Sequence, residues 1–152
     1  MKLHIGADHR GAEAATRLAE RLTTLGHEVR VISPSPGETC DYPEPAFVIG
    51  HAVASGECQM GVLICGTGVG MCIAANKIKG VRAASVHDEI TAELSRSHND
   101  ANIICLSADL LGQRLIEKIV DTCVGTTFSG GRHERRLNKI RQIEEGKDPR
   151  SA

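Results

Sequence analysis

The 152-residue sequence has few aromatic side chains, with one Tyr, two Phe and no Trp. Binding of single-stranded nucleic acid by base stacking needs several exposed rings, so this class of function is excluded. The apolar core must instead be built from Ala, Val, Ile and Leu, since hydrophobic residues still make up 41% of the chain. With 24% charged residues, the composition is that of one globular domain of ordinary size.

Long hydrophobic runs and signal-peptide features are also missing. The longest uncharged stretch, Cys58–Asn76, holds four Gly and several polar residues, so we expect no membrane span. Asp8 and Arg10 interrupt any apolar segment near the N-terminus, which predicts no signal peptide. The six Cys form no CxxC pair and no zinc-ligand spacing, so we expect a reduced, cytoplasmic chain without a metal site.

The net charge is close to zero, at −1, but it is unevenly distributed along the chain. Residues 1–131 carry 11 Lys and Arg against 15 Asp and Glu, whereas residues 132–152 carry 7 against 4. A basic C-terminal segment on an acidic body indicates an anion site or an interface. The segment is too small for a general nucleic-acid footprint.

Hydrophobic periodicity predicts that strands and helices alternate about five times. This alternation predicts a single-domain, doubly wound, Rossmann-like parallel sheet of about five strands, with helices on both faces. We assign residues 1–146 to this domain and residues 147–152 to a C-terminal tail. The expected strands are Lys2–Gly6, His27–Ser33, Met60–Cys65, Val81–Val86 and Ala101–Leu106. The expected helices are 12–25, Ala46–Ala54, Met71–Lys79, His87–His98, Asp109–Val124 and the basic His133–Glu145, with Pro34–Pro45 as a loop.

The strongest local signal is Ile64–Gly70, which leaves a buried strand and enters a helix. Its three alternate glycines let backbone N–H groups converge on an anion, and the helix dipole favours negative charge there. The same field stabilises a thiolate, so Cys65 is a candidate thiolate. The plainer interpretation is a tight turn beside a buried Cys. Met71 excludes both a dinucleotide fingerprint and a Cys-x5-Arg phosphatase loop, so the segment suits a small anion held by backbone amides.

Three other polar segments are further candidates. Asp8 and His9 follow the first strand and are expected in the same crevice as Cys65, although a helix N-cap with a surface His is the plainer interpretation. Ser97–Asp100 lies between a helix and a strand, where a polar loop is common. Arg132 and Arg136 are four residues apart on one helix face, which suits a phosphate, or else they belong to a solvated basic helix.

Taken together, these segments resemble the family of ribose-5-phosphate isomerase type B, which also includes galactose-6-phosphate isomerase subunits. The likeness covers nearly the whole chain, and several ordered motifs are more specific than any one of them. It rests on Gly6–His9, Asp41–Pro43, Ile64–Gly70, Ala74–Lys77, Leu94–Arg96, His98–Asn102 and Gly130–His133.

The resemblance implies aldose–ketose isomerisation, interconverting ribose 5-phosphate and ribulose 5-phosphate through an enediolate, without metal or organic cofactor. It implies that Cys65 moves the proton between neighbouring sugar carbons and that Thr67 assists this base. It also implies that His98 promotes ring opening, with Asp8 nearby, and that His9 and two Arg hold the phosphate. The implied substrate-binding residues are Asp8, His9, Tyr42, Gly66, Thr67, Gly68, Val69, Gly70, Asn99, Arg132 and Arg136.

Members of this family form dimers or larger oligomers with sites shared between subunits. We therefore expect a homo-oligomer, either dimer or tetramer, a phosphosugar substrate, and no nucleic-acid or membrane partner. One position departs from the family pattern, since Asp109 stands where family members carry an Arg of the phosphate grip. Asp109 either caps the following helix or indicates another substrate. The alternatives are thus an isomerase of another aldose phosphate, such as a hexose 6-phosphate, and a phosphosugar-binding module without turnover.

Overall fold

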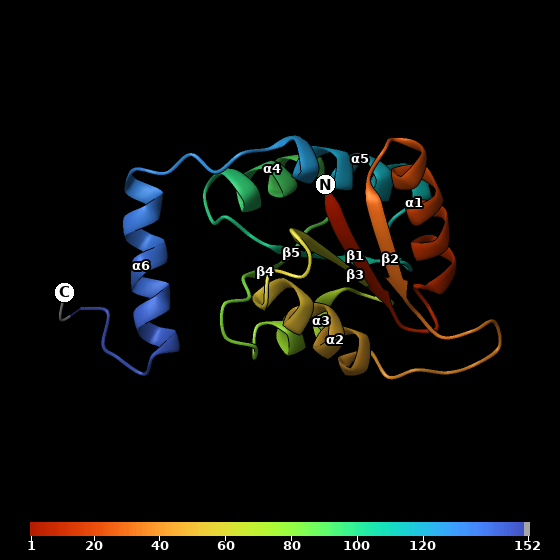
Figure 1. Cartoon of the computed structure of the whole chain (residues 1–152), viewed down its shortest axis with the longest axis horizontal. Helices are drawn as coiled ribbons and strands as arrows, with labels where there is room; N and C mark the ends of the chain where they lie inside the picture. The colour runs from red at the N-terminus through yellow and green to blue at the C-terminus, as the bar shows by residue number, and fades with distance from the viewer. Residues whose placement is uncertain (151–152) are drawn as a thin grey trace.

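A computed structural model describes residues 1–150 and shows a five-stranded parallel sheet (Figure 1). The strands are β1 (Lys2–Ala7), β2 (Glu28–Ile32), β3 (Met60–Cys65), β4 (Ala83–Ser85) and β5 (Ile103–Ser107), in the order β2-β1-β3-β5-β4. All four neighbouring pairs are parallel, which confirms the predicted sheet. Residues 151–152 of the predicted tail lie outside the described residues.

Helices cover both faces of the sheet, as predicted (Figure 1). One face packs against α1 (Ala12–Thr24), α4 (Glu89–Ser97) and α5 (Gln113–Gly125), and the other against α2 (Pro43–Ala54) and α3 (Val69–Ala75). The last helix, α6 (Arg132–Glu144), stands apart from these two layers. Each face has its own apolar cluster, and both are aliphatic, as the shortage of aromatic residues requires.

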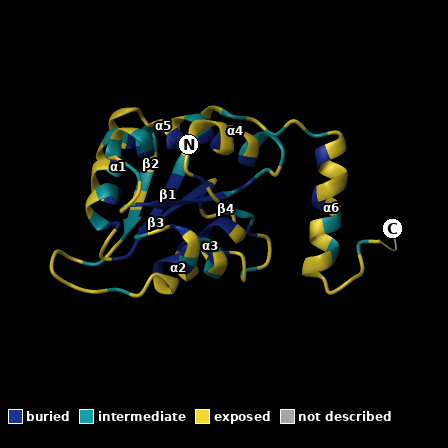
Figure 2. Cartoon of the chain, turned by 180° about the vertical axis from the view of Figure 1, so that it is seen from behind, coloured by how far each residue is buried: buried dark blue, intermediate teal, exposed yellow. Residues whose placement is uncertain are grey.

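Strand β3 shows how the sequence divides its side chains between the two clusters. All six of its residues are buried, as expected of a central parallel strand, and Figure 2 shows the buried sheet between exposed helix faces. Because side chains alternate along a strand, Val62 and Ile64 join the α1, α4 and α5 cluster, whereas Leu63 and Cys65 join the α2 and α3 cluster. Burying a side chain such as Leu63 contributes roughly 1.5–3 kcal/mol. This alternation turns the Cys65 side chain toward α2 and α3.

Helices α2 and α5 start at other residues than the sequence predicts. Helix α2 begins at Pro43, inside the segment Pro34–Pro45 that was expected to be a loop. Proline is compatible with a first helical turn, because the N–H it lacks has no partner there. Helix α5 begins at Gln113 rather than at Asp109, and Gly112 is its N-cap. The N–H groups of Ala108 and Asp109 donate to the carbonyls of Cys65 and Gly66, which ties the stretch before α5 to the glycine loop.

Helix α3 and strand β4 are shorter than predicted. The helix runs from Val69 to Ala75, whereas Met71–Lys79 was expected. It ends where Asn76 turns its side chain to β4, donating from Nδ2 to the Ala83 carbonyl at 2.8 Å and accepting from the Ala83 N–H at 2.9 Å. These contacts replace a backbone partner at the open edge of β4. Among residues 1–150, no helix is long and apolar enough to cross a membrane.

Candidate active site

Cys65 is the last residue of β3, and its sulfur lies under the glycine loop that follows. Gly68 N–H donates to Cys65 Sγ at 3.1 Å, and the side chain is 4% exposed. Gly68 has φ +78°, a left-handed conformation that favours glycine, and a Cβ there would lie 3.0 Å from the Leu106 backbone. The glycine therefore allows the chain to turn tightly enough to place an amide on the sulfur.

The glycine loop is anchored to the end of β5. The Ser107 hydroxyl is fully buried and donates to the Gly66 carbonyl at 2.6 Å. The N–H groups of Ala108 and Asp109 donate to the carbonyls of Cys65 and Gly66 at 2.8 and 3.1 Å. Three donors at the end of β5 thus hold the loop in one conformation. Sequence reasoning assigned no role to Ser107, and only the pairing of Cys65 with Ser107 across the sheet identifies it.

An ion pair lies directly over this loop. Arg10 Nη2 donates to Asp109 Oδ1 at 2.8 Å, and Arg10 Nε donates to both carboxylate oxygens at 2.9 and 3.1 Å. A Cβ on Gly66 would lie 3.0 Å from Asp109 Oδ2 and 3.2 Å from Arg10 Cδ. The hydrogen bond and the charge of Asp109 raise the pKa of Arg10.

This geometry corrects one expectation and adds a residue. Asp109 does not cap the following helix, because Gly112 occupies the N-cap and the Asp109 carboxylate is directed to Arg10. Arg10 is the one cation next to Gly66 in the described contacts, and sequence reasoning gave it no site role. The two residues are 99 positions apart, so no local motif links them.

The other residues predicted at the carboxyl end of the sheet are also found there. Asp8 Oδ1 accepts from the N–H groups of Arg10 and Gly11 at 2.9 and 3.0 Å, which shapes the turn into α1. His9 Nδ1 lies 3.2 Å from the Cys40 carbonyl, and since a carbonyl only accepts, Nδ1 carries the proton. The ring of Tyr42 lies against Gly70, where a Cβ would meet it at 2.7 Å.

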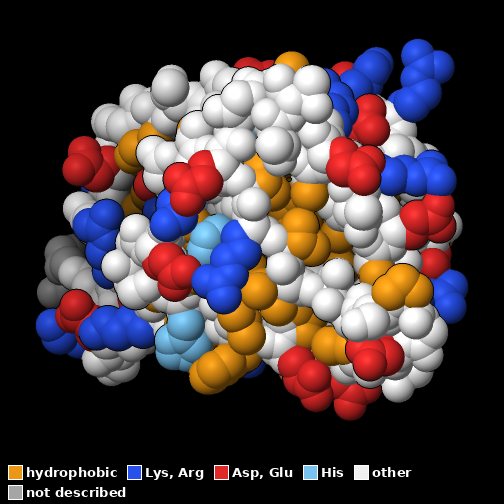
Figure 3. Space-filling model, turned by 45° about the vertical axis from the view of Figure 1, so that its right-hand side comes forward, with side chains coloured by type: hydrophobic (Ala, Val, Ile, Leu, Met, Phe, Trp, Pro, Cys, Tyr) orange, Lys and Arg blue, Asp and Glu red, His pale blue; other side chains and the backbone are white. Residues whose placement is uncertain are grey.

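A cavity beside His9 extends this region away from the loop. It has a volume of about 720 Å³ and lies between α1 and the segment 33–36. Figure 3 views the molecule with this side turned forward, and shows apolar side chains in a hollow surrounded by acidic and basic ones. The mixture of charges indicates a polar rim rather than a uniformly positive surface.

His98 and Asn99 lie at the opposite end of the sheet from Cys65. They follow α4 and lead into the amino end of β5, whereas Cys65 pairs with Ser107 at the carboxyl end of that strand (Figure 1). The four steps from Ile103 to Ser107 span about 13 Å. The expectation that His98 has Asp8 nearby is therefore wrong within one chain, because a crossover helix returns the chain to the amino ends of the strands.

The basic helix α6 joins the His98 end. The rings of His98 and His133 stack with centroids 4.1 Å apart and an interplanar angle of 13°. Arg132 Nε donates to His133 Nε2 at 3.4 Å. Burial, followed by the charges of His98, Arg132 and Arg136, lowers the pKa of His133, which fits its role as an acceptor. Within one chain, Arg132 and Arg136 therefore lie near His98 and Asn99 and far from Cys65.

The predicted site residues thus form two groups in the chain. The carboxyl-end group surrounds the glycine loop, and the amino-end group surrounds His98. Within residues 1–150, no group of three or more His, Cys, Asp or Glu is placed to hold a metal ion. The carboxyl-end group contains Asp8, His9, Tyr42, Cys65, Gly66, Thr67, Gly68, Val69 and Gly70, and the amino-end group contains His98, Asn99, Arg132 and Arg136.

A parallel α/β sheet with a thiol under a glycine loop defines a class of proteins that handle small anionic ligands at the carboxyl ends of strands. Comparison with known proteins narrows this class, since the model of the family described as Ribose/Galactose Isomerase matches residues 3–140. The chain belongs to this family of isomerases.

Individual relatives are similar to this chain over nearly its full length. "Ribose-5-phosphate isomerase B" of Escherichia coli is 40% identical over 144 residues, covering 95% of this chain and 97% of that protein. "D-erythrulose-4-phosphate isomerase" of Pectobacterium atrosepticum is 37% identical, with 95% of each chain covered. The crystal structure of ribose-5-phosphate isomerase B from Mycoplasma genitalium with bound ribulose-5-phosphate has a TM-score of 0.91 and 41% identity, covering 95% of this chain and 96% of that one.

Proposed function

We propose that the protein interconverts ribose 5-phosphate and ribulose 5-phosphate through an enediolate, with Cys65 as the base. The observation that carries the proposal is the Cys65 sulfur held at 3.1 Å by Gly68 N–H, under an amide-rich loop at the end of a parallel strand. Family membership and the names of the relatives support the reaction type. In this proposal residues 1–146 form the catalytic domain and residues 147–152 its tail.

The chemistry follows from the loop. Cys65 removes the proton from C2 of the open-chain aldose, the released electron pair forms the C1=C2 double bond, and the carbonyl electron pair moves onto O1. A proton then passes from the O2 hydroxyl to O1, the O2 electron pair forms the C2 ketone, and the proton held by Cys65 returns to C1. The negative charge that develops on the sugar oxygen is stabilised by backbone N–H groups of residues 66–70. Thr67 lies on this loop and assists the base. An assay of the purified protein for ketose formation from ribose 5-phosphate tests the proposal. If no aldose phosphate yields a ketose, the protein is a phosphosugar-binding module without turnover.

We further propose that the complete site forms between two copies of this chain. His98, which opens the sugar ring, and Asn99, which binds it, are at the far end of the sheet from Cys65 in the same chain. A second copy supplies them without any rearrangement of the fold. Exposed apolar side chains of α2, α3 and the residue before α2 suit such a copy. They are Tyr42, Phe47, Val48, Val69 and Ile73.

The phosphate is held by His9 of one copy and by Arg132 and Arg136 of the other. Arg132→Ala is expected to raise the KM for ribose 5-phosphate roughly 10–100-fold, because a charge-assisted hydrogen bond contributes about 1.5–3 kcal/mol. The turnover number should change less, since the phosphate keeps its charge during proton transfer.

Steady-state kinetics with ribose 5-phosphate and with ribose measure this prediction. Unphosphorylated ribose is the control, because it lacks the group that Arg132 binds and should respond little to the substitution. An equal rise in KM for both sugars would show that Arg132 does not act on the phosphate. Arg150→Ala is the matched control, since Arg150 pairs with Asp148 in the exposed tail.

A second candidate substrate is a phosphosugar of another length. The Arg10–Asp109 pair over Gly66 favours this candidate, because the carboxylate cancels the charge of Arg10 where an anion would approach. The Pectobacterium relative bears the name of a four-carbon ketose phosphate isomerase, so the family is not restricted to pentoses. A panel of four-, five- and six-carbon aldose phosphates separates the candidates by kcat/KM.

Asp109→Asn is expected to lower the KM for ribose 5-phosphate about two- to fivefold, because it removes a partly exposed charge worth about 0.4–1 kcal/mol. Arg10→Ala is expected to raise the same KM, since it leaves the Asp109 carboxylate unpaired beside the loop. Kinetics of the two single variants and of the double variant measure the coupling. Unchanged KM in both single variants would show that this ion pair does not act on the phosphate.

A further inference from the structure

Asp100 has an unusual backbone conformation directly after the proposed site residues His98 and Asn99. Its φ of +44° is the only positive value among the non-glycine residues of the range 1–150. Side chains rarely adopt this left-handed region, although Asp and Asn tolerate it better than others. The turn that follows α4 is therefore held in a conformation that the chain alone does not favour.

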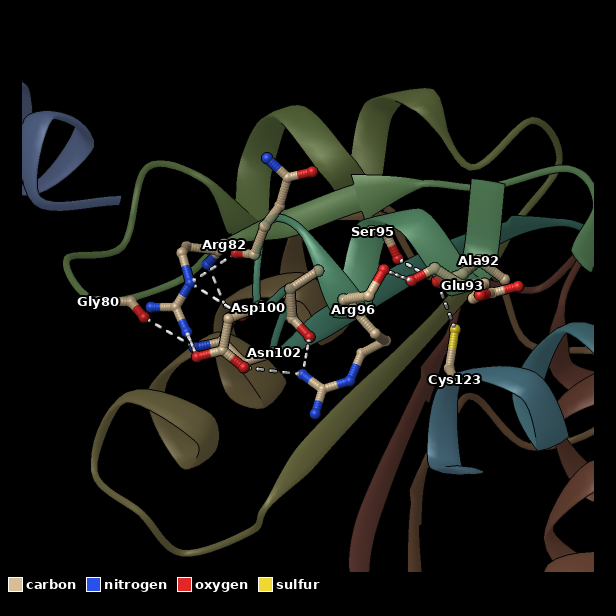
Figure 4. Close-up of polar contacts among 12 residues, drawn as sticks. Gly80, Arg82, Ala92, Glu93, Ser95, Arg96, Asp100, Asn102 and Cys123 are labelled. Carbon is tan, nitrogen blue, oxygen red and sulfur yellow. Dashed lines mark hydrogen bonds and ion pairs between the residues drawn. The ribbon is translucent and has the colours of Figure 1, made fainter. Parts of the chain in front are cut away.

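Two arginines from different elements hold this turn (Figure 4). Arg82, just before β4, donates from Nη2 to Asp100 Oδ2 at 2.8 Å, and Arg96, on α4, donates from Nη1 to Asp100 Oδ1 at 3.3 Å. Arg82 Nε also donates to the carbonyls of Asn99 and Asp100 at 3.2 and 2.9 Å. Arg96 Nη1 donates to the Ala101 carbonyl at 2.5 Å. Three consecutive carbonyls and both carboxylate oxygens are thus fixed by two side chains.

Asn102 attaches the same turn to the segment before β4. Its Oδ1 accepts from Arg82 N–H at 2.7 Å, and its Nδ2 donates to the Gly80 carbonyl at 2.8 Å. The side chains of Arg82, Arg96 and Asp100 are 25%, 16% and 35% exposed, so water weakens these contacts only in part. We call Arg82, Arg96, Asp100 and Asn102 the Asp100 clamp.

The Asp100 clamp makes more charged contacts than a stable turn requires. Glycine adopts a positive φ without strain and needs no charged partner. Arg96 Nε is buried and has no hydrogen-bond partner within residues 1–150, a cost that a turn selected for stability alone would avoid. What the clamp does fix is the direction in which His98 and Asn99 leave α4.

The clamp also reaches α6 through His98. The His98 ring stacks on His133, and Ser129 N–H donates to the Ser97 carbonyl at 2.9 Å. The segment between α5 and α6 is therefore bonded to the same turn. We propose that Asp100 is a positioning residue, which with Arg82 and Arg96 sets the orientation of His98 and Asn99 toward the glycine loop of a second copy. This inference rests on the proposed function and its shared site.

Asp100→Gly tests the proposal, because glycine accepts the positive φ and lacks the side chain that the two arginines bind. The turnover number is expected to fall about 10–100-fold, since a misplacement of about 1 Å can cost that much. The KM is expected to change less, because Arg132 and Arg136 remain. Asp100→Asn, which tolerates the same φ and keeps one acceptor, should recover most of the turnover. Asp121→Asn is the matched control, since Asp121 accepts from Arg21 at 2.6 Å, away from the turn, and should keep full turnover.

Mixed oligomers separate positioning from general damage to the fold. Asp100→Gly chains mixed with Cys65→Ala chains should regain activity, because an intact Cys65 then meets an intact Asp100 clamp from the other chain. Asp100→Gly mixed with His98→Ala should not, because both changes affect the same half of the site. Where Cys65→Ala and His98→Ala chains do restore each other, recovery in neither of these mixtures or in both would overturn the positioning role. Wild-type turnover of Asp100→Gly alone would overturn it in any case. If Asp100→Gly does not fold, Arg82→Ala takes its place in the same comparison, because it removes the contacts to the Asp100 carboxylate and to the carbonyls of Asn99 and Asp100.

The proposed shared site fails by a different result. If Cys65→Ala and His98→Ala chains, each inactive, regain no activity together, the shared site is overturned. Asp100→Gly turnover and its rescue by Asp100→Asn are measured on unmixed protein, so they judge the clamp independently of that outcome.

Discussion

Cys65→Ala is expected to fold normally and to lose turnover by about 10²–10⁴-fold or more, the usual cost of removing a general base. The variant loses one sulfur at the end of β3, where the side chain is 4% exposed, and leaves the backbone contacts of the glycine loop in place. Turnover on ribose 5-phosphate and thermal unfolding of the same preparation measure the two parts of the prediction.

Cys123→Ala is the matched control for this substitution. Cys123 lies on α5 and is buried against α4, where burial raises its pKa to about 12, so it is not a thiolate at neutral pH. It should keep wild-type turnover, as should Cys58→Ala and Cys105→Ala. Wild-type turnover by Cys65→Ala would exclude Cys65 as the base, whatever the controls show.

A thiol reagent is a poorer test than substitution. The hydrogen bond from Cys105 lowers the pKa of Cys72 to about 7, although burial opposes the shift. Cys72 is half-buried on α3, so we expect a reagent applied near neutral pH to modify it whether or not Cys65 reacts. Inactivation by such a reagent therefore needs the Cys72→Ala background before it can be assigned to Cys65.

The sheet and the glycine loop could be predicted because their signals are local. A buried apolar run that ends in Cys65 and passes into three alternate glycines specifies a strand and a turn within a few residues. The parallel arrangement then follows from the helices between strands. The same reasoning placed Asp8 and His9 at the carboxyl end, where the structure has them.

The remaining site features depend on contacts between distant parts of the chain. Asp109 has the sequence pattern of a helix cap, and only the register of β1, β3 and β5 brings it to Arg10. Ser107 anchors the glycine loop for the same reason. The separation of His98 from Asp8 follows from strand direction, which could have been applied to the sequence, since the residue before a strand lies at its amino end.

That separation leads to a test with a large effect. Cys65→Ala and His98→Ala chains should each be nearly inactive, because each removes an acid–base group, at a cost of about 10²–10⁴-fold. In a shared site, Cys65 of one copy works with His98 of the other. A mixed dimer therefore carries one site with both substitutions and one site with neither.

Mixing the two inactive variants should restore about a quarter of the wild-type rate per chain, since random pairing makes half of the dimers mixed and each mixed dimer has one intact site of two. The chains are unfolded and refolded together, or co-expressed with different tags so that the mixed species can be purified, and turnover on ribose 5-phosphate is compared with each variant treated alone. Purified mixed dimers should reach about half of the wild-type rate by the same reasoning. Cys65→Ala with Cys65→Ser is the matched control and should stay inactive, because both changes affect the same half. If the mixture is no more active than either variant alone, the whole reaction takes place within one chain. If His98→Ala alone keeps full activity, His98 has no part in the reaction.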